Sequence, residues 1–184
     1  TIYYRLKVTC SGSDAWTNEC LVSPSDCQFD PAYNTGISYS SIAGTGTNYT
    51  FSGTSTDDNT SAAVSLSGTT FTYKGQPVSG LKACTNGWLT FNTSSTATDY
   101  LNNIGSSSTS LRAIVAPFWE DLVCQGNPGT TAGLNACMKY EIVGTLGSGS
   151  AQIICEWIGM ETYNNAGPNL NFQVVLDENG NTIT

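Results

Sequence analysis

The side chains best suited to carry chemistry in this chain are seven cysteines, and they occur in a sequence that has no histidine. The cysteines are Cys10, Cys20, Cys27, Cys84, Cys124, Cys137 and Cys155. Without imidazole there is no Ser-His-Asp or Cys-His nucleophile pair and no His-ligated zinc, so most enzyme classes are disfavoured. None of the cysteines forms the C-x-x-C pair of zinc ribbons or redox sites. Disulfide bonds, and with them a secreted or cell-surface location, are therefore predicted.

Acidic residues are the next candidates for chemistry. Glu120 and Asp121 follow Pro-Phe-Trp, and a carboxyl group beside aromatic rings can have a raised pKa and act as an acid, as in glycosidases. No second carboxylate at a recognisable spacing completes a catalytic pair. Asp121 is therefore interpreted as a turn cap or a partner of backbone amides beside a core Trp119. No catalytic residue is predicted, and the chain is expected not to be an enzyme.

Two stretches offer the oxygen ligands that Ca²⁺ prefers. The first is Asp57-Asp58-Asn59, which is interpreted as a solvated loop. The second, DENGN, carries Asp177, Asn179 and Asn181, but its glycine is misplaced for an EF-hand loop and the closing glutamate is missing. It is interpreted as a hairpin turn. No metal site and no cofactor are predicted, and a calcium-dependent rise in the melting temperature would contradict both interpretations.

Aromatic and asparagine side chains suggest further binding or modification sites. Four tryptophans and two tyrosines could stack on sugar rings, namely Trp16, Trp88, Trp119, Trp157, Tyr100 and Tyr163. The alternation around the last three tryptophans suits core positions better. The N-x-S/T pattern occurs at Asn48, Asn59 and Asn92, and it marks glycosylation sites only if the host modifies such sequences.

The charge balance limits the partners. The chain has 6 basic residues against 14 acidic ones and a net charge of -8, so it lacks the basic surface that phosphate binding needs and no nucleic-acid partner is expected. No apolar run approaches the roughly 20 residues of a membrane helix, so no membrane span is predicted. Thr1 begins directly in a strand-like run. A signal that this sequence does not carry is therefore expected to direct export.

The elements that must position these residues are short strands. Apolar residues alternate with polar ones in segments separated by Gly/Asn turns, which predicts an all-β sandwich or barrel. The predicted strands are 49–51, 63–66, 70–73, 81–84, 88–91, 114–116, 138–143, 152–160, 171–176 and one that begins at Thr182. The predicted turns between them are Lys74 to Pro77, Thr85 to Gly87 and Glu178 to Asn181.

The first 23 residues form a separate predicted hairpin. Residues 2–10 alternate with period 2, a turn follows at Ser11 to Asp14, and residues 16–22 return. The stretch YYRLKVTCSGSDAWTNECLV resembles the last two strands of an immunoglobulin-like or fibronectin type III-like domain. That resemblance implies that Cys10 pairs with a cysteine upstream of Thr1. The alternative is that the hairpin belongs to the main domain.

Residues 24–47 are predicted to be a linker, because Pro24, Pro31 and several Ser and Gly residues disfavour strands. A Cys20–Cys27 disulfide would fasten this linker to the hairpin. The β-sandwich module is predicted over residues 48–184.

The module carries a set of motifs in a recognisable order. TNGWLTFN is followed by LRAIVAPFWEDL, MKYEIVG, IICEWIGME and NLNFQVVLDENGNTI. This order resembles a β-rich extracellular module of Bacteroidota proteins exported by type IX secretion, and the A-P-F-W-x-D segment is similar to the nidogen-like domain. The resemblance implies adhesion or surface-scaffold roles and no catalytic residues. In such modules the last strand continues past Thr184, so the sequence is expected to be cut within a domain.

Two disulfides are predicted within the module from the positions of the strands. Cys124 and Cys137 bracket a loop of 12 residues, and a bond between them would close it. Cys84 and Cys155 lie in separate strand-like runs, and a bond between them would join distant parts of the sandwich. With Cys20–Cys27, this scheme leaves only Cys10 unpaired.

Two functions follow as hypotheses. The first is a non-enzymatic module of a large secreted or cell-surface protein, acting in adhesion or as a structural component of a surface or filament. The second is a carbohydrate-binding or accessory domain of a secreted hydrolase. The expected partners are other domains of the same chain, surface glycans or further copies of the chain. An exposed row of aromatic side chains would favour the second hypothesis.

Overall fold

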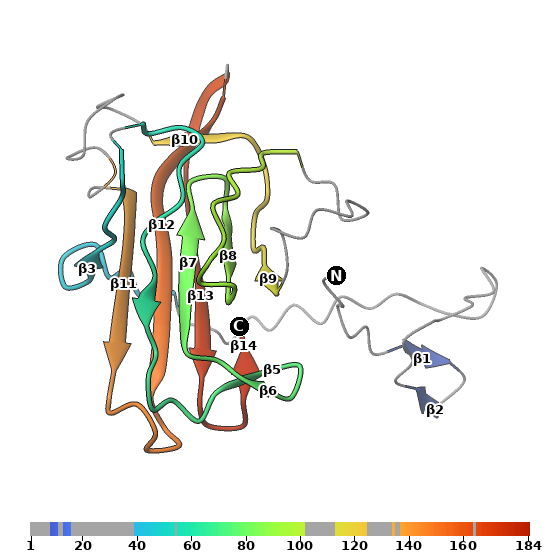
Figure 1. Ribbon diagram of the computed structural model, residues 1–184. Coiled ribbons are helices and arrows are strands. Elements are labelled where there is room, and N and C mark those ends of the chain that lie inside the picture. Colours follow the sequence, from blue (N-terminus) through green and yellow to red (C-terminus); the bar gives the residue numbers. More distant parts are fainter. Residues whose placement is uncertain are drawn as a thin grey trace. The chain divides into compact units, whose positions relative to one another are not determined.

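The computed structural model describes residues 8–10, 13–15, 39–53, 55–101, 113–124, 134, 137–163 and 165–184. Every element named in these residues is a β-strand, which confirms the all-β prediction (Figure 1). Among the described residues, no helix has the length and apolar character that crossing a membrane requires.

The larger of two sheets is built around two long antiparallel strands. Its order is β14 (Thr182–Ile183), β13 (Asn165–Asp177), β12 (Gln152–Thr162), β11 (Met138–Val143) and β3 (Thr47–Asn48), and β10 (Leu122–Cys124) also pairs with β12. The first part of β12 pairs with β11 and its last part with β10. The strands β10 and β11 therefore follow one another along the same edge of β12.

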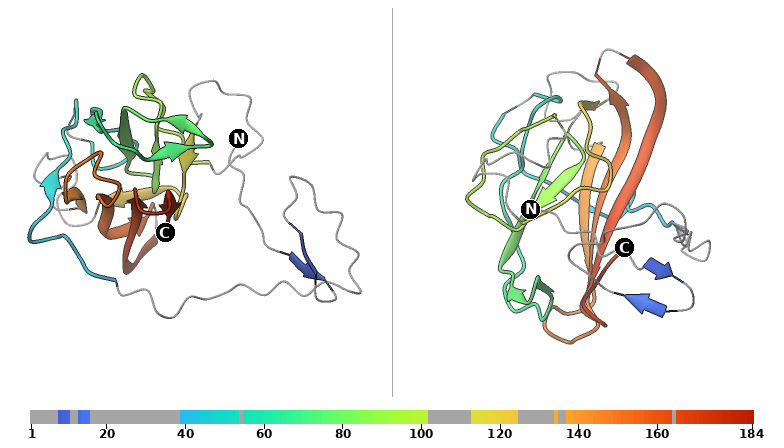
Figure 2. Two further views of the ribbon diagram at one scale, coloured as in Figure 1. Left: turned by 90° about the horizontal axis from the view of Figure 1, so that it is seen from below. Right: turned by 90° about the vertical axis from the view of Figure 1, so that its right-hand side faces the viewer.

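The second sheet faces the first across one hydrophobic core (Figure 2). Its order is β4 (Val64–Ser65), β7 (Gly80–Cys84), β8 (Trp88–Thr90) and β9 (Ile114–Val115). Leu81 and Leu89 from this sheet share the core with Ile153, Trp157 and Leu176 from the larger one. A short hairpin of β5 (Thr72–Tyr73) and β6 (Gln76–Pro77) completes the described strands of residues 41–184. The arrangement is a β-sandwich, as predicted.

Most predicted strands of the module are present, with shifted ends. The differences are at β10 and β6, which were not predicted, and at residues 49–51, where the strand β3 lies just upstream instead. The strand β10 has only three residues and directly follows the Pro117 to Asp121 segment. It gains its backbone partners from β12, far away in the sequence, and such pairing leaves no local signal.

The N-terminal hairpin consists of β1 (Val8–Cys10) and β2 (Ser13–Ala15). Val8 pairs with Ala15 and Cys10 with Ser13, so the return strand begins inside the stretch predicted to be the turn. The remainder of the predicted hairpin lies outside the described residues. Its origin in an immunoglobulin-like or fibronectin-like domain stays a prediction.

The sandwich begins upstream of β3. Residues from Ser41 to Thr184 form one compact unit. Ile42 is 5 % exposed, and its backbone N–H donates to Oε2 of the fully buried Glu156 in β12 over 2.7 Å. The last residues of the predicted linker therefore pack on the larger sheet. The division into residues 1–23, 24–47 and 48–184 stays a prediction.

The predicted Cys124–Cys137 disulfide is present, with 5.8 Å between the two Cα atoms. Cys124 pairs with Met160 on β12, while the neighbour of Cys137, Met138, pairs with Trp157. The bond therefore fastens the two strands that share one edge of β12. In the loop-entropy model, closing a loop of this length stabilises the fold by about 3 kcal/mol. The predicted Cys20–Cys27 bond lies outside the described residues.

The predicted Cys84–Cys155 bond is not formed, since both residues are free and fully buried cysteines. The residue of β12 that faces Cys84 is Trp157, whose indole N–H donates to the Cys84 carbonyl oxygen over 2.8 Å. Side chains on one face of a strand recur every two residues, so Cys155 lies one such step along β12. There it lies beside the hydroxyl of Tyr49. The pairing was wrong because it depends on the register between two sheets.

Neither free thiol should react in the folded protein. Burial raises the pKa of Cys84 to about 11 and that of Cys155 to about 12, so both lack the thiolate that alkylating reagents attack. Iodoacetamide should modify these two residues in guanidinium chloride but not in native buffer, as read by peptide mass spectrometry. A Cys84–Cys155 linked peptide from the unreduced protein would contradict the structure and restore the predicted disulfide.

Candidate functional site

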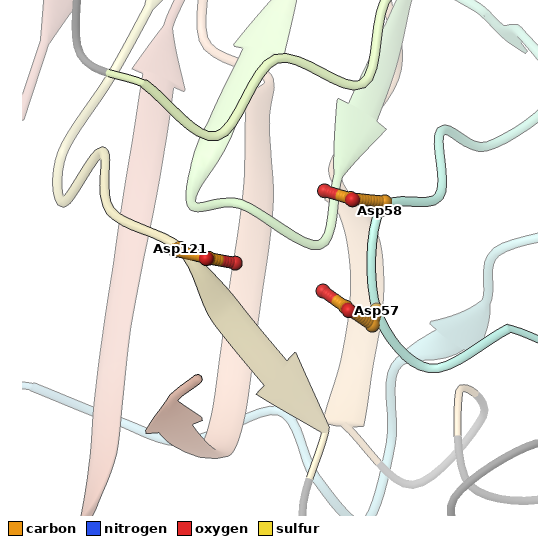
Figure 3. A group of neighbouring side chains, drawn as sticks. All are labelled: Asp57, Asp58 and Asp121. Atoms are coloured by element: carbon orange, nitrogen blue, oxygen red, sulfur yellow. The ribbon is translucent and has the colours of Figure 1, made fainter. Parts of the chain in front are cut away.

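Three carboxylates from distant parts of the sequence meet at one end of the sandwich (Figure 3). They belong to Asp57 and Asp58, in the loop between β3 and β4, and to Asp121, directly before β10. One oxygen from each lies within 4.8 Å of the others. We call this group the carboxylate cluster. Asp121 thus has carboxylate neighbours, which its sequence surroundings did not predict.

Asn86 connects the two segments that carry the cluster. It lies in the turn between β7 and β8 and is fully buried. Its side-chain N–H groups donate to Oδ1 of Asp58 over 2.7 Å and to the Thr98 carbonyl over 2.9 Å. Its Oδ1 accepts the backbone N–H of Leu122 over 3.0 Å. The predicted Thr-Asn-Gly turn is therefore also the support of the site.

The loop before β4 has its own hydrogen bonds. Ser55 accepts the N–H of Asp57 over 3.3 Å and also donates to its carbonyl. Asn59, 8 % exposed, donates its side-chain N–H to the Ser55 carbonyl over 3.0 Å, and its backbone N–H donates to Thr85 Oγ1 over 2.9 Å. The interpretation as a solvated loop thus fits the exposed Asp58 but is wrong for Asn59.

The cluster concentrates negative charge. Partial burial, followed by the charges of Asp58 and Asp121, raises the pKa of Asp57. Partial burial, followed by the charges of Asp58 and Glu120, raises the pKa of Asp121. Perturbed carboxylates that face one another are a physical signature of functional sites. The arrangement is suited to holding a cation, because positive charge would relieve this repulsion.

The second predicted oxygen-rich stretch forms a turn between β13 and β14, as interpreted. Asp177 Oδ1 accepts the N–H of Asn179 over 2.7 Å. Asn181 bonds through its side chain to the backbone N–H and carbonyl of Thr72, over 2.6 Å and 3.1 Å. These oxygens therefore serve the turn and its contact with β5.

Aromatic side chains near the carboxylate cluster are of two kinds. Trp88 and Trp119, 0 % and 8 % exposed, both donate their indole N–H to the Asp99 carbonyl, over 2.9 Å and 3.0 Å. With the fully buried Trp157 they confirm the predicted core positions, while Trp16 lies outside the described residues. Three other aromatic residues of these segments are exposed, namely Tyr100, Phe118 and Tyr163.

Backbone hydrogen bonds and chain neighbours connect these three exposed aromatic residues to the segments that carry or support the carboxylate cluster. Tyr163 donates its N–H to the Asp121 carbonyl over 2.7 Å, and Phe118 donates its N–H to the Gly87 carbonyl over 3.4 Å. Tyr100 follows Asp99, whose carbonyl holds both indoles. Of the N-x-S/T asparagines, Asn48 is exposed and Asn92 is half-buried. This end of the sandwich therefore carries exposed aromatic rings and the carboxylate cluster on connected loops.

A family model described as NIDO related matches residues 28–184. The match covers the whole sandwich and begins within the predicted linker. No match to the chain was found among curated proteins or among solved structures. The nidogen-like part of the sequence resemblance is thus confirmed. By this match the chain belongs to the NIDO-related family, and it is an extracellular module.

Proposed function

We propose that the chain is a non-enzymatic module of a large secreted or cell-surface bacterial protein, and that it acts in adhesion or as a structural component of the surface. The observation that carries this proposal is the NIDO-related match over residues 28–184. The Cys124–Cys137 disulfide is consistent with an oxidising compartment. The Bacteroidota and type IX origin belongs to the same proposal.

The chemistry of the available side chains also favours a role without catalysis. The chain has no histidine to activate a nucleophile. Cys84 and Cys155 are buried, and their pKa values of about 11 and about 12 keep them protonated near neutral pH. A reactive cysteine would instead be partly exposed, with a lowered pKa.

The second candidate function is carbohydrate binding, as an accessory domain of a secreted hydrolase. One observation favours it, namely that Tyr100, Phe118 and Tyr163 are 44 %, 42 % and 48 % exposed on loops connected to the carboxylate cluster. Aromatic faces stack on sugar rings and carboxylates accept sugar hydroxyls. Exposed rings and carboxylates on connected loops therefore suit a glycan chain.

Binding assays with the purified chain distinguish the two candidates. We expect fluorescent beads coated with the chain to adhere to surfaces covered with extracellular-matrix proteins. Replacing Tyr100, Phe118 and Tyr163 together with alanine should reduce retention at least about tenfold, because exposed aromatic anchors dominate such contacts. Val143→Ala, at a residue 46 % exposed on β11, is the control and should change retention less than twofold.

A glycan array tests the carbohydrate-binding candidate directly. Binding to glycans that the aromatic variant abolishes, without adhesion to proteins, would favour the carbohydrate-binding candidate over adhesion. Binding to neither panel would contradict both adhesion and carbohydrate binding and leave only the structural role of the first candidate, to be tested by deletion of the module from the parent protein.

A further inference from the structure

We propose that Asp57, Asp58 and Asp121 bind a calcium ion, which joins the loop before β4 to the segment before β10. This inference reverses the expectation that the chain has no metal site. It does not rest on the proposed function, since the ion would bind whether the module acts in adhesion or in glycan binding.

The geometry of the carboxylate cluster fits one ion. Calcium lies about 2.3–2.6 Å from each oxygen ligand, so two ligands of one ion are at most about 5 Å apart. The three oxygens lie within 4.8 Å of one another, which meets this limit for every pair. Figure 3 shows the carboxylates of Asp57 and Asp121 pointing toward one another, with Asp58 beside them.

Asp57 supplies a second, independent observation. Its Oδ1 is shielded from solvent and has no hydrogen-bond partner in the described part of the chain. A buried carboxylate oxygen without a partner is costly, because the hydration it loses on folding is not replaced. Since this carboxylate points toward Asp121, an ion held between the two would supply the missing partner.

The donor set selects the type of ion. Three carboxylates are hard oxygen ligands, which favour calcium or magnesium over zinc or copper. Magnesium requires near-ideal octahedral geometry and keeps most of its water, whereas calcium accepts the irregular geometry of ligands from two loops. Extracellular calcium modules have dissociation constants of about 10⁻⁴–10⁻³ M. The raised pKa values of Asp57 and Asp121 agree with the need for positive charge here.

Isothermal titration calorimetry of the intact chain with calcium chloride tests the proposal. We expect one site with a dissociation constant of about 10⁻⁴–10⁻³ M. The melting temperature should rise in about 5 mM calcium relative to EDTA, as linkage requires of any ligand of the folded state. The same concentration of magnesium should raise it much less. No heat, or equal rises with both cations, would overturn the proposal.

Substitutions in the cluster should weaken calcium binding without lowering the stability of the calcium-free protein. Asp57→Asn and Asp121→Asn should each weaken calcium binding at least about tenfold, because each removes a charged ligand. In EDTA the same variants should melt no lower than the parent, because they also relieve repulsion. Asp58→Asn is the reserve if either variant fails to fold.

Asp99→Asn is the matched control, because it removes one exposed negative charge beside Thr98, whose carbonyl accepts from Asn86, but none from the cluster. It should change calcium affinity less than about twofold, as a long-range screened charge would. An equal loss of affinity in Asp99→Asn and Asp121→Asn would show a diffuse charge effect in place of a site, and would overturn the proposal.

Discussion

Replacing Gly87 with alanine should destabilise the sandwich by about 4 kcal/mol or more, the largest effect that we expect from any single substitution here. Gly87 has φ +74, and a Cβ atom built on it would lie 1.8 Å from the Phe118 carbonyl oxygen. Backbone atoms on both sides must move before any side chain fits. Because the Gly87 turn and the Phe118 segment both hold the carboxylate cluster in place, the site should be lost with the fold.

Urea unfolding followed by tryptophan fluorescence measures this effect, since Trp88 is fully buried next to the turn. The matched control is Gly75→Ala, in the turn between β5 and β6. Gly75 has φ +72 but open space around it. Gly75→Ala should lower the free energy of unfolding by only about 1–2 kcal/mol, the cost of holding alanine in the left-handed backbone conformation. Equal losses in the two variants would mean that the approach of Phe118 to Gly87 has no energetic weight.

The contrast between these glycines shows that local sequence patterns predict turns but not the contacts between distant loops. Both turns were predicted from sequence, because each has a glycine between two strand-like runs, and glycine adopts positive φ at no steric cost. The approach of Phe118 to Gly87 depends on how two loops far apart in the sequence meet, and no spacing encodes it. Alternating apolar residues likewise predicted the long β11 and β12, while the three-residue β10 was missed.

The cysteines divide in the same way. Cys124 and Cys137 could be paired because a disulfide that closes one loop between neighbouring strands is a local inference. Pairing Cys84 with Cys155 required the register between the two sheets. In that register Trp157 lies against Cys84, and its indole N–H donates to the Cys84 carbonyl oxygen.

The candidate site was missed because its parts were judged singly. Asp57-Asp58 was interpreted as part of a solvated loop, and Asp121 as a turn cap or a partner of backbone amides. Their meeting depends on the buried Asn86, which bonds to Asp58 and to Leu122. The signal in the sequence was the unusual pair of motifs, three acidic residues in two turn-rich segments, but only the fold decides that they converge.

The carboxylate of Glu178 differs from those of the cluster, because hydrogen-bond donors of the protein surround it and it needs no cation. Glu178, in the turn after β13, is 7 % exposed. Its Oε1 accepts from the Thr69 hydroxyl over 2.7 Å, from Thr70 N–H over 3.0 Å and from Gly147 N–H over 2.8 Å. Its Oε2 accepts from Gly149 N–H over 2.9 Å. These bonds join three turns, and nothing in the sequence around DENGN distinguished this glutamate.

The pKa of Glu178 reflects these donors. Burial alone raises it, but the hydrogen bonds from Gly147, Thr69, Thr70 and Gly149 outweigh burial and lower the pKa to about 2. A carboxylate whose pKa is lower in the folded state than in the unfolded state, here about 4.5, stabilises the fold fully above the higher value. That contribution is lost as the pH falls from about 4.5 toward about 2.

Glu178→Gln should therefore cost about 2–4 kcal/mol near neutral pH, because the amide N–H₂ would face backbone donors that now bond to a carboxylate oxygen. Glu141→Gln is the control with the same change in charge. Glu141 is bonded to the Thr45 hydroxyl at the surface over 2.8 Å, so its loss should be below about 0.5 kcal/mol.

The two substitutions should also differ in their response to acid. Denaturant unfolding at pH values from 7 to about 2.5 should show the parent and Glu141→Gln losing stability below pH about 4.5, while Glu178→Gln follows a flatter curve over that range. The difference between the parent and Glu178→Gln should accordingly shrink as the pH falls. A difference that stays constant with pH would mean that Glu178 acts through shape alone, and that its charge contributes nothing to joining the three turns.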